Sequence, residues 1–295
     1  MHGRFERTIR RPVEVRGVGF LTGRDVTLRF HPAEAGHGIA FQRSDLAGSA
    51  PIPARLEFTA PRERRTAIER NGVAIEMIEH VMAALAGLQI DNCQVELDAP
   101  EPPGMDGSSQ DFTEALLSAD SAVQAARKRL FVSGPASLVT GRGRDRCEIS
   151  YRPVARPTLA ITYHLDYGPR SPIPPQELTV EITPESFQSE LAFSRTFVLE
   201  REAHELRAAG YGARTSPREL LVIGPNGPID NALRSPDEFA RHKILDCLGD
   251  FALLGCDIQG HFSAYRSGHH LNREIIRQLL AQAAYEGSTG LRAAA

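Results

Sequence analysis

The segment 239–251, F-A-R-H-K-I-L-D-C-L-G-D-F, places an imidazole and two carboxylates among apolar residues. His242, Asp246 and Asp250 follow one another at intervals of four residues. Because residues four apart on an α-helix differ by only ~40° around its axis, these side chains would lie along one stripe. Imidazole and carboxylate both bind a borderline cation such as Zn²⁺, and Asp250 is placed to orient a neighbouring group. The alternative is an amphipathic helix whose solvated face carries this spacing without function.

A second candidate is the dipeptide Glu79-His80, which lies in the otherwise apolar segment 75–88, I-E-M-I-E-H-V-M-A-A-L-A-G-L. A charged pair in such a segment costs free energy unless it is paired or bound to something. His80 could add a third ligand to His242 and Asp246, and Glu79 could act as a base toward water. Three protein ligands with an open position are typical of catalytic zinc. The alternative is a salt bridge from Glu79 to an arginine or lysine, beside a hydrogen-bonded histidine.

Three histidines lie within residues 260–272, G-H-F-S-A-Y-R-S-G-H-H-L-N. On a Gly- and Ser-containing loop that enters a helix, they are either surface residues or a source of a general acid, and their spacing does not choose between them. The stretch 194–197, S-R-T-F, places a hydroxyl beside an aromatic ring and indicates nothing by itself. The sequence contains no phosphate-binding or dinucleotide-binding glycine loop and no G-x-S-x-G nucleophile motif.

Length and composition indicate an ordinary globular protein. The chain has 295 residues, of which 41% are hydrophobic and 24% charged, with a net charge of −3. The mixed charges provide no basic field for nucleic acid, and the basic run 61–65 is expected to be a solvated loop. None of the four cysteines forms a C-x-x-C pair. Without a signal peptide or a membrane-spanning apolar run, we expect a cytoplasmic protein with reduced thiols and no transmembrane segment.

Short strands and helices are predicted to carry these residues. Strands are expected at 8–15, 26–30, 38–42, 93–97, 146–151, 159–165 and 178–182, and helices at 75–88, 112–117, 201–209, 236–254 and 271–284. The Ala-rich, basic passage 118–129 has helical propensity and is the best candidate for a boundary between domains 1–125 and 126–295. Runs of strands followed by helices, twice, predict an α+β protein of two layered domains.

Six motifs occur in order over nearly the whole chain: G-V-G-x-x-T-G at 17–23, E-H-x-x-A-A-L-A-G-L-x-I-D-N at 79–92, M-D-G-S at 105–108, R-T-F at 195–197, H-K-x-L-D-x-x-G-D at 242–250 and S-G-H-x-L-N at 267–272. Together they resemble the zinc-dependent UDP-3-O-acyl-N-acetylglucosamine deacetylases of lipid A biosynthesis. The resemblance implies two domains of β-α-α-β type, with helices packed on sheets and the active site between the domains. It also implies hydrolysis of the N-acetyl group of an acylated UDP-sugar with release of acetate, and a monomer.

The resemblance assigns a metal site and a base. His80, His242 and Asp246 match the zinc ligands of the family, and Glu79 matches its general base. Iron is a chemical alternative, because two imidazoles and one carboxylate also suit Fe²⁺.

The remaining catalytic residues are also implied by the resemblance. His269 matches the residue that protonates the leaving amine or steadies the oxyanion, and Asp250 matches the carboxylate that orients it. Thr196 and Lys243 match groups that contact the tetrahedral intermediate or the substrate. Phe197 matches an aromatic residue that packs on the sugar.

Two segments depart from the family pattern. Leu21 stands where the family usually carries a histidine, and the segment 212–219, G-A-R-T-S-P-R-E, replaces a Gly- and Ser-rich segment. Both regions are associated with substrate, so a related zinc amidase acting on a different N-acetylated sugar remains an alternative, as does a non-catalytic zinc-binding relative. His261 and His270 stand where small residues are common and are expected to be exposed.

Overall fold

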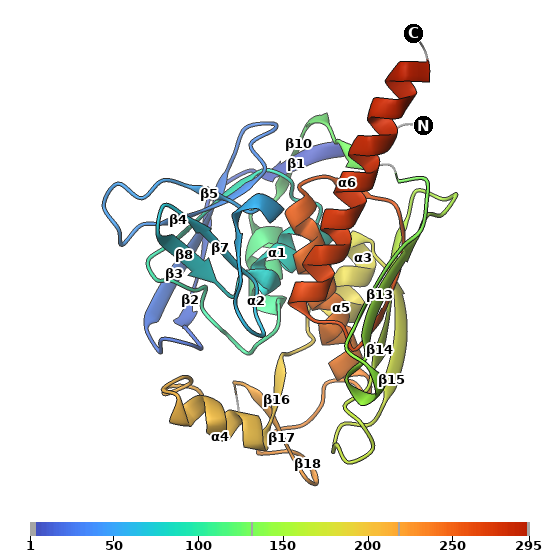
Figure 1. Cartoon of the computed structure of the whole chain (residues 1–295). Helices are drawn as coiled ribbons and strands as arrows, with labels where there is room; N and C mark the ends of the chain where they lie inside the picture. Colours follow the sequence, from blue (N-terminus) through green and yellow to red (C-terminus); the bar gives the residue numbers. More distant parts are fainter. Residues whose placement is uncertain (1–3, 131, 218, 294–295) are drawn as a thin grey trace.

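The computed structural model describes residues 4–130, 132–217 and 219–293. Two five-stranded sheets form the outer layers, and helices from both halves of the chain lie between them (Figure 1). This combination of separate helices with mostly antiparallel sheets confirms the expected α+β class. The layers matter for function, because helices that are distant in the sequence meet in the middle of the molecule.

The first sheet has the strand order β2-β3-β9-β4-β5, with one parallel pair, β4 and β9. Its strands are β2 (Val13–Val18), β3 (Asp25–Pro32), β4 (Ile39–Arg43), β5 (Ile52–Pro53) and β9 (Cys93–Leu97). Alternate residues of β3, namely Val26, Leu28 and Phe30, are buried, because successive side chains of a strand point to opposite faces. On the buried face, Phe30 meets Phe112 of α2 (Gln110–Ser118) edge to face.

A three-stranded sheet, β6 (Thr59–Ala60), β7 (Ala67–Arg70) and β8 (Val73–Glu76), leads directly into α1 (Glu79–Gly87). The helix expected at 75–88 is therefore wrong at its first four residues. Ile75 and Glu76 pair with Ile68 and Ala67 in the sheet, and Met77 has a φ of 58° that interrupts the chain before the helix. A short apolar run fits a buried strand and a buried helix equally well, so periodicity alone could not separate the two.

The second sheet has the order β12-β13-β20-β14-β15, with a parallel pair between β14 and β20. Its strands are β12 (Ala136–Thr140), β13 (Cys147–Arg152), β14 (Leu159–Leu165), β15 (Gln176–Glu181) and β20 (Gly260–Tyr265). The strand expected at 159–165 is confirmed, and those expected at 146–151 and 178–182 are displaced by one or two residues. Helix α5 (Glu238–Phe251) packs on β14 and β15, and α6 (His269–Ala293) packs on β12 and β13.

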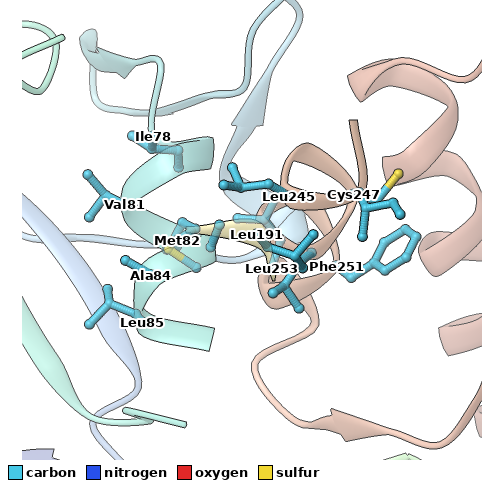
Figure 2. Packing of buried hydrophobic residues seen from close by; sticks show 14 of the residues in the cluster. Ile78, Val81, Met82, Ala84, Leu85, Leu191, Leu245, Cys247, Phe251 and Leu253 are labelled. Carbon is cyan, nitrogen blue, oxygen red and sulfur yellow. The ribbon is translucent and has the colours of Figure 1, made fainter. Parts of the chain in front are cut away.

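Helices α1 and α5 cross in close contact between the sheets. Gly249 of α5 permits this approach, because a Cβ atom added there would lie 2.1 Å from the carbonyl oxygen of Glu79. Farther along the crossing, Met82 of α1 points toward Leu245 of α5 and Leu253 of the following turn (Figure 2). The polar N-terminal residues of α1 are thereby brought against the middle of α5.

A smaller unit extends from these layers at the lower end of the view in Figure 1. It consists of β16 (Phe197–Leu199), α4 (Glu200–Ala208), β17 (Leu221–Gly224) and β18 (Gly227–Pro228). The helix expected at 201–209 is confirmed as α4, displaced by one residue. Shorter elements elsewhere are α3 (Pro184–Ser186), the π-helix Phe187–Leu191, the 3₁₀ turns Leu56–Phe58, Gly143–Asp145 and Ala252–Leu254, and the strand pair β11 (Arg129–Leu130) and β19 (Asp257–Ile258).

The passage 118–129 is not helical beyond the end of α2. It contains β10 (Ser121–Ala126), which pairs with β1 (Phe5–Ile9), so the proposed division at residue 125 falls inside a paired strand and stays a prediction. The single strand expected at 8–15 is also wrong. Arg10 turns its N–H toward the carbonyl groups of Ala119 and Asp120, which ends β1 before β2 begins.

The basic run 61–65 is only partly a solvated loop. Arg62 and Arg65 bind the carboxylate of Glu76 at 2.8 and 2.5 Å, which fixes the run against β8. Within the described parts of the chain, no helix is both long enough and apolar enough to cross a membrane.

Candidate active site

Three side chains from α1 and α5 converge on one point. His80 of α1 and His242 and Asp246 of α5 each present a ligand atom, and these atoms all lie within 4.8 Å of one another. The Nε2 atoms of His80 and His242 lie 3.6 and 3.3 Å from Oδ1 of Asp246. The planes of the two imidazole rings are inclined at 79° in an edge-to-face arrangement, with the ring centroids 5.0 Å apart. All three residues are buried.

The donors fit a divalent cation. Oδ1 of Asp246 is buried, and no group of the described residues makes a hydrogen bond to it. Such an orphaned carboxylate oxygen is costly unless something positive binds it. Nδ1 of His242 lies 3.1 Å from the carbonyl oxygen of Ser194, to which it can only donate. Nε2 therefore keeps its lone pair for binding a cation. Two imidazoles and one carboxylate suit zinc or iron.

The protonation states of these side chains suit the binding of a metal cation. Burial lowers the pKa of His242 to about 3, so the imidazole is neutral at neutral pH. Burial alone would raise the pKa of Asp246, but Lys243 and His242 lower it well below its usual range. Burial likewise opposes the ammonium of Lys243, whereas Asp246, at 2.6 Å, raises the pKa of that lysine well above its ordinary value. The site therefore holds the neutral imidazole of His242 and the carboxylate of Asp246, with the ammonium of Lys243 beside them.

Glu79 begins α1 and lies beside this cluster. Its Oε2 accepts a hydrogen bond from the backbone N–H of Thr66 at 3.0 Å, and its Oε1 lies 3.8 Å from Nε2 of His269. Burial raises the pKa of Glu79, against the opposing effect of His269 and His80. Among the described residues, no arginine or lysine forms an ion pair with Glu79, so the alternative of a simple salt bridge is wrong.

His269 is the first residue of α6 and is paired with Asp250 of α5. Its Nδ1 lies 2.9 Å from Oδ2 of Asp250, which also accepts a hydrogen bond from Asn272 at 2.8 Å. Burial alone would lower the pKa of His269, but Asp250 and Glu79 outweigh it and raise the pKa to about 9. The imidazole is therefore protonated at neutral pH.

Thr196 and Phe197 follow Ser194, whose carbonyl oxygen binds Nδ1 of His242. The backbone N–H of Thr196 donates to the carbonyl of Gly107 at 2.7 Å, which connects it to the M-D-G-S loop. The ring of Phe197 packs against Phe239 and also lies 6.2 Å from the ring of His242. Phe197 was expected at the site, and its ring lies beside His242, one of the three converging side chains.

Several residues that support the site were not expected. Thr66 forms hydrogen bonds with Glu79 and Asp250, and the carbonyl of Ser194 accepts a hydrogen bond from Nδ1 of His242. Asn272 shares Asp250 with His269. Its position three residues after His269 was a usable signal, because residues three apart on a helix are neighbours. Thr66 lies between two short strands, and nothing in the local sequence indicated it.

The two departures from the family pattern lie against each other. The loop at Leu21 is folded around the buried carboxylate of Glu101, which accepts hydrogen bonds from the backbone N–H groups of Leu21 and Thr22. From the segment 212–219, the N–H of residue 212 bonds to the carbonyl of residue 20, and the Arg214 guanidinium bonds to the carbonyl of residue 23 at 3.0 Å. They therefore form one continuous surface.

The two additional histidines differ from each other. His270 is exposed, as expected. His261 is not, because Nε2 lies 2.7 Å from the hydroxyl of Thr162 and Nδ1 receives the Arg152 guanidinium. Burial and the neighbouring arginine lower the pKa of His261. This residue belongs to β20 of the second sheet, and none of these interactions involves His80, His242 or Asp246.

Known proteins resemble the chain over most of its length. The sequence profile of the family described as UDP-3-O-acyl N-acetylglycosamine deacetylase matches residues 6–281. The UDP-3-O-acyl-N-acetylglucosamine deacetylase of Myxococcus xanthus (strain DK1622) is 37% identical over 278 residues, which are 94% of this chain and 86% of the relative. Proteins of the same name from Geotalea uraniireducens (strain Rf4) and Brucella melitensis biotype 2 are 37% identical over 280 residues, covering 94% of this chain and 89% and 96% of their own lengths.

Proposed function

The chain belongs to the family of UDP-3-O-acyl-N-acetylglucosamine deacetylases, and from that premise we propose that it removes the acetyl group of UDP-3-O-acyl-N-acetylglucosamine in lipid A biosynthesis. The observation that carries this proposal is the convergence of His80, His242 and Asp246 beside Glu79 and a protonated His269. A purely structural metal site would need neither a base nor an acid next to its ligands.

We propose that His80, His242 and Asp246 hold the catalytic cation, which we take to be Zn²⁺, with Fe²⁺ as the chemical alternative. A divalent cation bound there would supply Lewis-acid chemistry, which for zinc lowers the pKa of water to about 7. Metal analysis of the purified protein decides between zinc and iron.

The side chains of the protein then divide the proton transfers. Glu79 takes the proton of the water molecule that attacks the acetamide carbonyl. His269, which is protonated and held by Asp250, gives its Nε2 proton to the nitrogen as the C–N bond breaks. Acetate leaves, and the sugar keeps a free 2-amine.

Two further residues are proposed to stabilise charge. The hydroxyl of Thr196 and the ammonium of Lys243 are assigned to the developing oxyanion or to the substrate. One well-placed donor to an oxyanion contributes roughly 3–4 kcal/mol to transition-state stabilisation. The ring of Phe197, which lies beside His242, is assigned to the sugar.

Replacement of Glu79 tests the mechanism. In Glu79→Gln, we expect kcat to fall roughly 10²- to 10⁴-fold, the usual range for loss of a general base, while the bound metal stays near one ion per chain. Acetate release and metal content are measured on the same samples. Glu185→Gln, at an exposed position, serves as the control and should match the wild type. Unchanged turnover in Glu79→Gln would show that the base is misassigned.

A second candidate function is the same hydrolysis on a different N-acetylated sugar or sugar nucleotide. The contact between the Leu21 loop and the segment 212–219 favours it, because both departures from the family pattern then modify one surface. Acetate release from UDP-3-O-acyl-N-acetylglucosamine by metal-loaded protein supports the first candidate. Release only from another N-acetylated sugar supports the second. The cytoplasmic location and the monomeric state stay predictions.

A further inference from the structure

Thr66 connects the proposed base to the proposed acid. It is completely buried and lies between β6 and β7. Its backbone N–H donates to Oε2 of Glu79 at 3.0 Å, and its carbonyl accepts the N–H of Ile78, the residue before α1. Its hydroxyl binds Oδ1 of Asp250, the carboxylate that holds His269. Thr66 therefore contacts the proposed base directly and is connected to the proposed acid through Asp250.

Arg273 determines the direction of the hydroxyl proton. Its Nη1 lies 3.0 Å from Oγ1 of Thr66, and a guanidinium can only donate. A threonine hydroxyl has a single hydrogen, so with Arg273 as the donor to Oγ1, that hydrogen is directed at Asp250. Arg273 is itself 5% exposed, so water competes little for these groups.

The carboxylate of Asp250 is consequently held on both oxygens. Oδ1 accepts from Thr66, and Oδ2 accepts from His269 and Asn272. Without the hydroxyl, Oδ1 would be a buried acceptor with no hydrogen-bond partner among the described residues, and the carboxylate would gain freedom to rotate toward other donors. A rotation of Asp250 would displace the ring of His269, because His269 is bound to the same carboxylate.

From these contacts we propose that Thr66 is a positioning residue that sets the separation of Glu79 and His269, with Arg273 orienting its hydroxyl. This proposal rests on the proposed function of the same site. The two groups must exchange protons with one reacting centre, and their facing atoms, Oε1 and Nε2, are 3.8 Å apart. A misplacement of about 1 Å between reacting groups costs up to ~10²-fold in rate.

The test compares Thr66→Val with Thr66→Ser. Valine keeps the branched shape and the backbone N–H but removes the hydroxyl, whereas serine keeps the hydroxyl. We expect Thr66→Val to lower kcat by ~10- to 100-fold with KM within about twofold of the wild type, and Thr66→Ser to recover most of that loss. Metal content should be equal in all three proteins. Wild-type kcat in Thr66→Val, or an equally slow Thr66→Ser, would overturn the proposal.

Thr113→Val is the matched control. Thr113 is also buried, but its hydroxyl donates to the carbonyl of Ser109, the residue before α2, and not to Glu79, Asp250 or His269. This variant should keep the wild-type kcat. An equal loss in Thr113→Val and Thr66→Val would assign the effect to general packing and reject a positioning role.

Two further measurements keep the proposal testable if Thr66→Val does not fold or if the substrate is different. In Arg273→Met, Thr66 loses its fixed donor, so kcat should fall several-fold, and Arg273→Lys should recover part of it. Crystal structures of the wild type and the Thr66 and Arg273 variants provide a readout without substrate. A changed separation of Glu79 Oε1 and His269 Nε2 supports the proposal, and an unchanged one in every variant rejects it, whereas failure of the wild type to release acetate rejects only the proposed function.

Discussion

The carboxylate of Asp250 is fully buried, and its pairing with His269 favours the protonated form of that imidazole. His269, Asn272 and Thr66 all bind this one group. An ion pair in such surroundings is costly to break, because either partner would be left as an unpaired buried charge. The protonated imidazole is therefore a property of the folded protein and has a measurable effect on stability.

The pH dependence of stability tests this pairing in the metal-free protein. The pKa of His269 is about 9 in the folded state and about 6.5 when unfolded, so its contribution is complete below about pH 6.5 and is lost as the pH rises toward 9. The difference in unfolding free energy between the wild type and His269→Gln should shrink by about 3 kcal/mol between about pH 5.5 and pH 9.5. Urea titrations measure it. A constant difference would contradict the pairing.

At the scale of elements, the site depends on how closely α1 approaches α5. The proposed metal ligands are divided between these helices, with His80 on one and His242 and Asp246 on the other. Gly249, one residue before Asp250, allows the two backbones to meet. Met82 of α1 and Leu245 of α5 belong to the same buried hydrophobic cluster (Figure 2).

Gly249→Ala should therefore weaken both folding and metal binding. The added Cβ would lie 2.1 Å from the backbone oxygen of Glu79, so α1 must move and carry His80 with it. We expect a loss of about 1–3 kcal/mol in unfolding free energy, typical of an overpacked core, together with a higher Kd for Zn²⁺. Both are measurable by urea denaturation and competition with a chelator.

Gly87→Ala, at the other end of α1, is the control. There the new Cβ would meet the ring of Phe187, so stability should fall while the Kd for Zn²⁺ stays near the wild-type value. Equal weakening of metal binding by both substitutions would mean that the crossing at Gly249 has no special role.

At the scale of the whole molecule, ion pairs connect Arg4, the residue before β1, to both halves of the chain. Arg4 binds Asp91, which follows α1, and Asp257 of β19 in the second half. Arg127 binds the same two carboxylates. With Glu6, which also pairs with Arg127, these groups form a partly buried network where the two halves meet. Such networks contribute more than isolated surface pairs.

Asp257→Ala tests the contribution of this network. Two arginines would lose a partly buried partner, so we expect a loss of about 1–3 kcal/mol in unfolding free energy, between the values for exposed and buried pairs. Glu205→Ala removes an exposed partner of Arg201 on α4 and should cost less than about 0.5 kcal/mol. If both variants lose the same amount, the network adds nothing beyond ordinary surface charge.

The local part of the site was readable from the sequence. The spacing of His242, Asp246 and Asp250 predicted one helix with a common stripe, and that helix is α5. The class of the fold was predictable for the same reason, because strand and helix periodicities are properties of short segments. The start of α1 was not, since Ile75 and Glu76 fit a buried strand as well as a helix.

Only the tertiary structure decided what meets this helix. His80 lies more than 160 residues before His242 in the chain, and its approach depends on the packing of two helices and on the missing side chain of Gly249. Thr66 reaches Asp250 through a connection that no local pattern encodes. Periodicity acts over a few residues. The positions of the proposed metal ligands, base and acid are set by contacts between distant segments, and these contacts exist only once the core has formed.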